Sequence, residues 1–341
     1  MPELRKDPIL GRWVIISVER ARRPNTVEST IGKASPSGNC PFCRGREDKT
    51  PPEVFAIRKS GYNPNASDWD VRVVPSNAPV FRIEGDIGRK EKGLYDVMNG
   101  IGAHEIIVES PTHSKQLADL DYEEIQRVLT CFIQRTKDLE GDLRFKYVLI
   151  FKNHGVAAGA SEISHSRSQL IATPVTPRRV KEELIGARNY FFQNNRCIYC
   201  DIIRQETEAQ NRVIHETKEF VVITPFASRF PFEIWIVPKN HSSDFYKISQ
   251  LEQLALAQIM KIVFLKLRKG LDDPPFNMML HTAPFRREKS GYWSTIDNDY
   301  HWHIEIIPRI NNVAGFEWGT GFYICPISPE DAAIYLREVE I

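Results

Sequence analysis

Apolar residues recur at helical spacing in two long segments of the chain, about residues 121–139 and about residues 249–269. This spacing places them on one face of a helix, so both segments are predicted to be long amphipathic helices. Ahead of each helix lies an apolar run that ends in His-Ser, EIIVESPTHS at 105–114 and EIWIVPKNHS at 233–242. Both runs are predicted to be strands.

The order of elements after each helix also repeats. A strand is followed by a final strand that opens with histidine, HSRSQLIATP at 165–174 and HWHIEIIPRI at 301–310. Pro174 and Pro177 end the first of these strands, and a helix is expected to follow. The chain is therefore predicted to hold two copies of one α+β unit, with antiparallel sheets flanked by helices, in domains of residues 1–176 and 177–341.

The first final strand carries a row of polar side chains. Alternate residues of a strand share a face, so His165, Arg167 and Gln169 are expected to point the same way. The second copy holds, in the same order, His301, His303 and Glu305. A polar row on an otherwise apolar strand indicates a ligand site.

Composition narrows the class of protein. The 341 residues include 45 Lys and Arg against 44 Asp and Glu, which argues against a surface that coats nucleic acid. Charges near the start stand where a secretory signal needs an apolar run, and no stretch is apolar enough to span a membrane. A cytoplasmic protein without a membrane or nucleic-acid partner is expected.

Four of the six cysteines form two CxxC pairs, CPFC and CIYC. In a chain with no export signal such pairs indicate metal or redox chemistry, whereas Cys131 and Cys325 are expected to be small buried residues. Each half also offers two histidines, which completes a structural zinc set of four ligands. The expected ligands are Cys40, Cys43, His113 and His165 for the first ion, and Cys197, Cys200, His241 and His301 for the second. Iron in the second site, or buried thiols with core histidines and no metal, are the alternatives.

These motifs resemble the galactose-1-phosphate uridylyltransferase family, a branch of the histidine-triad superfamily that includes ADP-glucose phosphorylases. The family signature is G-x-S-x-x-H-x-H-x-Q, in which the first His binds zinc, the second attacks the α-phosphorus and the Gln contacts phosphate. The resemblance implies that Gly159 and Ser161 form the loop, that His165 binds zinc and that Gln169 contacts phosphate. Arg167 stands at the place of the nucleophile, and the stretch from Ser161 to His165 is one residue longer than in the family pattern.

The resemblance covers essentially the whole chain and implies further contacts. The positions that match nucleotide contacts are Arg20, Arg23, Asn77 and Asn153. The C-terminal segment matches a sugar- and phosphate-contacting stretch that reaches the other subunit's active site, which implies a homodimer; its residues are Phe316, Glu317, Gly319 and Thr320. The histidines expected to be structural or at the surface are His104, His215, His281 and His154, the last being the first exception to consider because it adjoins the loop.

The resemblance predicts a nucleotidyltransferase of the UDP-glucose:hexose-1-phosphate uridylyltransferase type, which moves a nucleoside monophosphate between a nucleotide sugar and a sugar phosphate. A guanidinium has no lone pair and cannot be the covalent nucleophile, but it can grip phosphate oxygens. The alternatives are therefore an adenylyl-transferring phosphorylase of the ADP-glucose phosphorylase type and a nucleotide-sugar-binding protein with impaired catalysis. A role for His303 in place of Arg167 is a further possibility.

Overall fold

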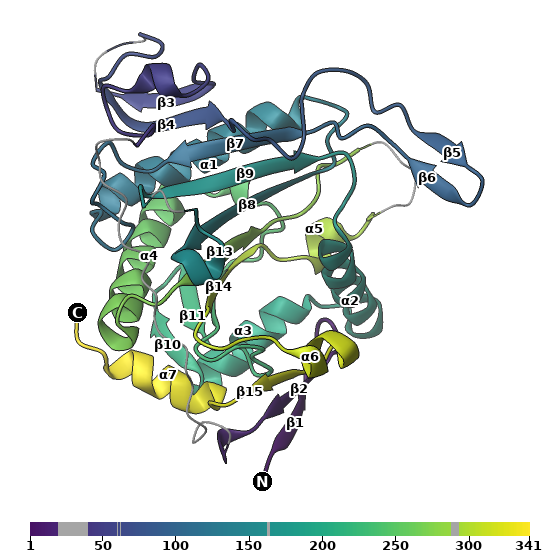
Figure 1. Ribbon diagram of the computed structural model, residues 1–341. Coiled ribbons are helices and arrows are strands. Elements are labelled where there is room, and N and C mark those ends of the chain that lie inside the picture. Colours follow the sequence, from purple (N-terminus) through teal and green to yellow (C-terminus); the bar gives the residue numbers. More distant parts are fainter. Residues whose placement is uncertain (20–39, 60, 62, 162–163, 288–292) are drawn as a thin grey trace.

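A computed structural model describes residues 1–19, 40–59, 61, 63–161, 164–287 and 293–341 (Figure 1). The strands of the first half are β1 (Glu3–Lys6), β2 (Trp13–Ile16), β3 (Phe55–Arg58), β4 (Trp69–Pro75), β5 (Lys90–Lys92), β6 (Tyr95–Val97), β7 (Ala103–Val108), β8 (Tyr147–His154) and β9 (Arg167–Thr173). Those of the second half are β10 (Val213–Glu216), β11 (Phe220–Ile223), β12 (Ile234–Pro238), β13 (Phe276–His281), β14 (His303–Pro308) and β15 (Tyr323–Cys325). The α-helices are α1 (Tyr122–Glu140), α2 (Arg178–Asn194), α3 (Ile198–Ala209), α4 (Gln250–Leu271), α5 (Ile296–Asp299), α6 (Gly315–Thr320) and α7 (Pro329–Glu338).

The two long helices form where the apolar periodicity predicts them, and each begins at a capping box. The Asp121 carboxylate accepts a hydrogen bond from the Glu124 backbone, and the Glu124 carboxylate accepts one from the Asp121 backbone. Ser249 and Glu252 exchange the same pair of bonds at the start of α4. These reciprocal bonds satisfy backbone donors that the first helical turn leaves free, which fixes where each helix starts.

Ten strands form one continuous sheet in the order β10-β11-β12-β14-β13-β8-β9-β7-β4-β3, and all of its pairs are antiparallel. The predicted α+β class with antiparallel strands is confirmed. The halves meet where β8 pairs with β13, so their two sheets are fused. This pairing removes two inner edges that would otherwise leave backbone donors and acceptors unpaired. The domain boundary at residue 176 stays a prediction.

Helices cover the two faces of the sheet unequally. On one face α1, α4 and α7 pack against strands of both halves in a single apolar core. On the other face α2 and α3 pack over the second-half strands and β8. Figure 1 shows α1 and α4 at one side of the sheet and α2 and α3 at the other. Over β4, β7 and β9 no described helix covers the second face, where Phe42 of the first CxxC turn packs instead.

Smaller elements complete the molecule. Strands β1 and β2 form a three-stranded sheet with β15, and a hairpin of β5 and β6 projects from the body (Figure 1). Strand β9 begins at Arg167, so His165 precedes the strand on which its side chain was expected. Among the described helices, none combines the length and the apolar character that crossing a membrane requires.

Candidate functional site

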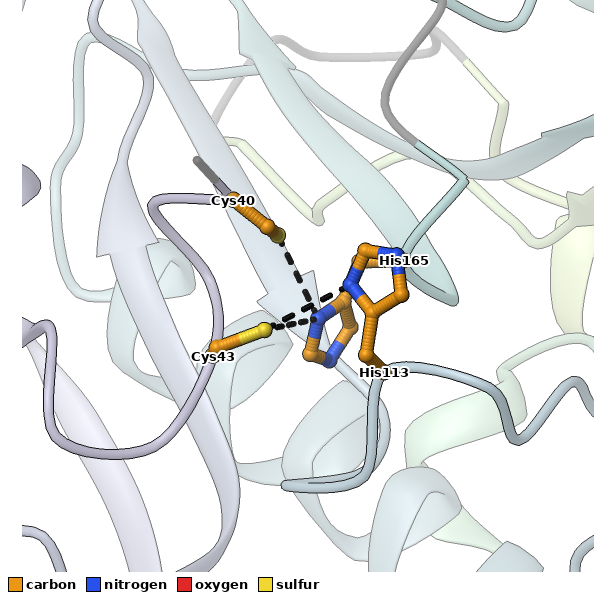
Figure 2. Close-up of side chains that lie close together, drawn as sticks. All are labelled: Cys40, Cys43, His113 and His165. Carbon is orange, nitrogen blue, oxygen red and sulfur yellow. Dashed lines mark hydrogen bonds between the residues drawn. The ribbon is translucent and has the colours of Figure 1, made fainter. Parts of the chain in front are cut away.

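The first set of predicted metal ligands comes together from three separate parts of the chain. Figure 2 shows the side chains of Cys40, Cys43, His113 and His165 pointing toward one another. The Nδ1 atom of His165 lies 3.5 Å from Cys40 Sγ and 3.7 Å from Cys43 Sγ. The Nδ1 atom of His113 lies 3.4 Å from Cys43 Sγ. All four ligand atoms lie within 4.8 Å of one another.

These separations fit a tetrahedral metal ion. Metal bonds of about 2.3 Å to sulfur and about 2.0 Å to nitrogen place neighbouring ligand atoms about 3.5 Å apart. The outer nitrogen of His165 donates to the Ser110 carbonyl at 2.7 Å, and that of His113 lies 3.1 Å from Ser164 Oγ. Such outer contacts hold the ring and leave Nδ1 with its lone pair toward the ion.

The second predicted set is assembled in the same way. Cys200 Sγ lies 3.5 Å from His241 Nδ1 and 3.7 Å from His301 Nδ1. The outer nitrogens of the two rings donate to backbone carbonyls, those of Asp297 at 3.0 Å and Pro238 at 2.8 Å. With Cys197 these ligand atoms also lie within 4.8 Å of one another. Both halves therefore contain a group that can hold a metal ion.

The pKa shifts of the first ligand set favour binding of a cation between its side chains. Burial lowers the pKa of His165 to about 4, so its ring is neutral and able to ligate. Burial and the neighbouring Cys40 raise the pKa of Cys43 to about 11. A thiol with this pKa releases its proton near neutral pH only when a cation stabilises the thiolate.

A cavity of about 370 Å³ opens beside the first set, on the face of the sheet that α2 and α3 leave free. Arg167 and Gln169 reach it from β9, and Asn153 reaches it from β8. Further lining comes from the loops that follow β4 and β8 and from the first CxxC turn, namely Asn77, Ala78, Gly159, Ala160, Ser161, Pro41 and Phe42. The structure thus brings together the expected first-half contacts that it describes. Arg20 and Arg23 lie outside the described residues.

Among the described residues that line this cavity, Arg167 is the one with a permanent positive charge. Its guanidinium donates to the His165 carbonyl at 3.0 Å and to Ser161 Oγ, and it lies 5.4 Å from the centre of the Phe42 ring. Burial lowers the pKa of Arg167, and the group still keeps its charge at neutral pH. Among the described residues that line the cavity there is no carboxylate. The cavity therefore favours an anionic ligand.

A buried ion pair holds β9 from behind the cavity. The Lys152 ammonium donates to Glu109 at 2.7 Å, to Ser166 Oγ at 3.0 Å and to the Arg167 carbonyl at 3.2 Å. The hydroxyls of Ser166 and Ser168 also donate to the Glu109 carboxylate. Because these serines alternate with the cavity residues along β9, their bonds fix the strand that presents Arg167.

His104 is a cavity residue that sequence reasoning placed among the structural or surface histidines. The backbone N–H of Val80 donates to His104 Nδ1 at 3.3 Å, and His104 Nε2 lies 3.0 Å from Gln169 Oε1. A backbone N–H can only donate, so neutral His104 carries its proton on Nε2 and donates to Gln169. The Gln169 side-chain oxygen then accepts from His104, and the NH₂ group of Gln169 is the end that can contact a ligand. No local sequence pattern points to His104, because its place beside Gln169 depends on the register of β7 against β9.

Other predicted residues lie elsewhere. His154 stacks on Phe276 and lies 3.3 Å from Asp273, so this histidine does not line the cavity, although it adjoins the loop. The C-terminal residues of α6 are absent from the described lining of the cavity. In that helix Phe316 is 46 % exposed and Trp318 is 79 % exposed.

The second half carries a closed charge network at the place of the cavity. His303 is buried between Tyr199, Trp235 and His281, and its role in place of Arg167 stays a prediction. His281, also buried, contacts the Glu183 carboxylate at 3.0 Å, contrary to the surface alternative. A third group of potential ligands within 4.8 Å of one another consists of Glu183, His281 and His303.

Comparison with known proteins places both halves in one family. Residues 1–177 match the model of the galactose-1-phosphate uridyl transferase N-terminal domain, and residues 183–335 match that of its C-terminal domain. An ADP-glucose phosphorylase of Arabidopsis thaliana is 39 % identical over 345 residues, covering 100 % of this chain and 93 % of the relative. A galactose-1-phosphate uridylyltransferase of Thermotoga maritima is 29 % identical over 349 residues, covering 100 % and 99 %.

Solved structures of the same kinds of protein are also similar to this chain. The crystal structure of an ADP-glucose phosphorylase from Arabidopsis thaliana with bound ADP-glucose matches with a TM-score of 0.85 and 37 % identity, covering 100 % of both chains. A uridylyltransferase structure matches with a TM-score of 0.74 and 27 % identity, covering 99 % of this chain and 97 % of the other.

Proposed function

Because this chain belongs to the galactose-1-phosphate uridyl transferase family, whose members transfer nucleotidyl groups between nucleotide sugars and sugar phosphates, we propose that its first-half cavity binds a nucleotide sugar. The observation that carries this proposal is the cavity itself, where Arg167 and Gln169 lie among neutral donors with no described carboxylate. The diphosphate of the nucleotide sugar binds at the end of the cavity that holds Arg167. Inorganic phosphate or a sugar phosphate is the acceptor.

ADP-glucose is the nucleotide sugar we favour, with UDP-glucose and the hexose-1-phosphate uridylyl reaction as the other family chemistry. The preference rests on the 39 % identity to an ADP-glucose phosphorylase against 29 % to a galactose-1-phosphate uridylyltransferase, both over the whole chain. The third possibility is a folded protein that binds nucleotide sugars but turns them over poorly. A substrate panel distinguishes it from the two active enzymes.

The residues of the cavity support a single displacement. Arg167 cannot form a phosphoramidate, and His104 has its Nε2 proton directed at Gln169. An acceptor phosphate oxygen attacks the α-phosphorus directly, the bond to the bridging oxygen breaks, and the sugar phosphate leaves with that electron pair. Arg167 and the Gln169 amide bind the phosphoryl oxygens as charge moves onto them. One displacement inverts the configuration at phosphorus.

Two structural zinc ions per chain belong to this proposal. The tetrahedral spacing of thiolate and imidazole ligands in both sets supports zinc, and iron in the second set is the alternative. The first ion would hold the CxxC turn that carries Phe42 against the base of β9. It supplies rigidity, and every contact to the ligand comes from the chain.

The oligomeric state and the cellular location that we propose follow from the same family resemblance. The exposed aromatic residues of α6 support a homodimer in which Phe316, Glu317, Gly319 and Thr320 contact the ligand of the other subunit. The two units are residues 1–176 and 177–341. The protein works in the cytoplasm in carbohydrate metabolism, with neither a membrane nor nucleic acid as a partner.

The test is a substrate panel on the natural protein and on Arg167→His. ADP-glucose and UDP-glucose are each incubated with phosphate and with galactose 1-phosphate, and products are separated by chromatography while intact-protein mass spectrometry detects adducts. The natural protein is expected to bind nucleotide sugar and to form no covalent nucleotidyl adduct. Arg167→His is expected to form one, at a rate limited by the longer loop.

Gln169→Ala is the matched control, because it removes a phosphate contact without adding an imidazole. An adduct on the natural protein would refute the single displacement, and mapping the modified residue would identify the nucleophile. Binding without turnover would favour the impaired binder. Failure of both nucleotide sugars to bind would contradict the proposed function.

A further inference from the structure

The second half contains its own cavity, of about 360 Å³, which matches the first-half cavity in place but not in charge. It lies between α3, the end of α2, the start of the chain and the strands β11 and β12. Binding cavities for small molecules are of this size or larger.

Strand register defines the first cavity. Val74 of β4 pairs with Ile106 of β7, and Ile106 pairs with Gln169 of β9. All three residues line the cavity, together with the four residues that follow Val74 and with Pro41 of the first CxxC turn. The phosphate contacts lie at the Gln169 end, so the apolar end at Val74 and Pro41 is where an uncharged ring would lie.

The second half repeats this register residue by residue. Ile223 of β11 pairs with Trp235 of β12, and Trp235 pairs with Glu305, the counterpart of Gln169. Ile223 and Trp235 line the second cavity, and so does Ile198, the counterpart of Pro41 in the second CxxC turn. The residues that follow Ile223 and line it are Pro225, Phe226 and Ala227. The second cavity is thus the repeat of the apolar end.

The phosphate end is closed in the second half. Glu305 is buried and forms ion pairs with Arg229 at 2.7 Å and Arg179 at 3.0 Å, so it does not line the cavity. The charged residues that do line it are Asp7, Asp201, Glu206 and Lys6. Each carboxylate is paired with an arginine, Asp7 with Arg12 at 2.8 Å, Asp201 with Arg204 at 2.8 Å and Glu206 with Arg212 at 2.7 Å. These arginines are already paired, and no arginine is among the described residues that line the cavity, so it offers a phosphate no counterpart of Arg167.

Two lining residues carry buried polar atoms without a partner among the described residues. Trp235 is 6 % exposed and its indole N–H is unpaired. Glu206 is 3 % exposed; its Oε1 accepts from Arg212 at 2.7 Å, while its Oε2 is unpaired. Buried donors and acceptors of this kind are costly unless a partner is supplied. The two atoms are a donor and an acceptor, as the edge of a planar heterocycle requires, and a ligand in the cavity reaches them only when the atoms that cover them move aside.

We propose that the second cavity binds an unphosphorylated nucleoside, which stacks against Trp235 while the first cavity holds the nucleotide sugar. The assignment of the apolar end to the base rests on the proposed function. The cavity and its unpaired atoms lie apart from the first cavity, although Lys6, Asp7 and Pro8 of the first half also line it.

Equilibrium dialysis with adenosine and with uridine tests the proposal. Ile202→Trp places a large ring at the mouth of the second cavity from a half-buried position on α3, and Gln169→Ala alters only the first cavity. Nucleoside binding is expected to survive Gln169→Ala and to be lost in Ile202→Trp, whereas nucleotide-sugar binding follows the opposite pattern. This crossed design separates failure of the proposal from failure of the proposed function.

Trp235→Phe provides the second variant, because it keeps an aromatic wall and removes the N–H. Loss of one hydrogen bond is expected to weaken nucleoside binding about fivefold. Melting curves establish that the variants are folded. The proposal is overturned if neither nucleoside binds at millimolar concentration, if Ile202→Trp binds as well as the natural protein, or if crystals soaked with adenosine show it only beside Gln169.

Discussion

His104 determines which end of the Gln169 carboxamide, the oxygen or the nitrogen, faces a ligand. The Val80 N–H fixes the tautomer of the ring, and the ring then fixes the amide. A free carboxamide can turn either its oxygen or its nitrogen toward a phosphate, and only the nitrogen is attractive. His104 is therefore a positioning residue that acts through Gln169.

The His104→Ala variant is expected to bind nucleotide sugar about fivefold more weakly, because the Gln169 amide loses its hydrogen bond to His104. Titration calorimetry measures the effect. His215→Ala is the matched control, since His215 is a half-buried histidine on β10 outside the cavity. Equal affinities for the two variants would remove the positioning role.

His281 links folding to pH. It is stacked on His303 and faces the carboxylates of Glu183 at 3.0 Å and Glu305 at 3.5 Å. Burial alone would lower the pKa of His281, but the two carboxylates outweigh it and raise the pKa to about 9. The pKa of His303 is lowered to about 4 by burial and by His281, so this ring stays neutral above that pH.

The folded state therefore binds a proton at His281 that the unfolded chain, with a histidine pKa of about 6.5, releases earlier. This stabilisation is complete below about pH 6.5 and is lost as the pH rises toward 9, a change on the order of 3 kcal/mol. Urea unfolding across this range measures it. In His281→Gln the decline should be smaller, and an unchanged decline would show that other groups cause it.

Strand β9 is held by a buried ion pair as well as by its ladder bonds. Glu109 accepts bonds from Lys152, Ser166 and Ser168, and all four residues are buried. Burial lowers the pKa of Lys152, and the Glu109 carboxylate opposes that change. Each side chain supplies a partner for the other's buried polar group.

The Glu109→Gln variant is expected to lose about 3–5 kcal/mol of unfolding free energy, because it leaves the Lys152 ammonium buried without its counter-ion. The double variant Glu109→Leu with Lys152→Met should recover much of this loss, since no charge is then stranded. Denaturant unfolding of Glu109→Leu, Lys152→Met and the double variant forms the cycle. Additive losses would mean that the two residues do not act as a pair.

At the scale of the whole molecule the metal sets join distant segments. The first set ties residues 40 and 43 to residues 113 and 165, and the second ties residues 197 and 200 to residues 241 and 301. We expect two zinc ions per chain by elemental analysis, and chelation should lower the melting temperature because metal binding is coupled to folding.

In the Cys43→Ser variant one ion should be lost and the second retained. Cys131→Ser is its control, because Cys131 lies in α1 away from both sets. Protein that contains no tightly bound metal would refute the prediction.

Helix α6 should be covered by a second copy of the chain. Its Trp318 is 79 % exposed, which is unusual for so large an apolar side chain without a partner. Light scattering is expected to find a dimer, and Trp318→Asp should shift it toward monomer, while the exposed Leu143→Asp should not. A monomeric natural protein at micromolar concentration would contradict the proposed assembly.

The sequence by itself determined the repeated unit, the two long helices and the metal sets. Helix periodicity and capping boxes depend on residues within one turn of each other, so segments such as Asp121–Glu124 carry their own signal. The CxxC pairs are likewise local, and cysteine and histidine have few other uses in such a pattern.

Only the tertiary structure decided which distant side chains meet. His104 and Gln169 are 65 residues apart, and Lys152 and Glu109 are 43 apart, so their pairing depends on strand register rather than on any local pattern. The fusion of both sheets at β8 and β13 and the unequal cover by α2 and α3 are also properties of packing. These long-range contacts leave the Arg167 end of the first cavity open and close the equivalent end in the second repeat with the ion pairs of Glu305, because equivalent strands meet different neighbours.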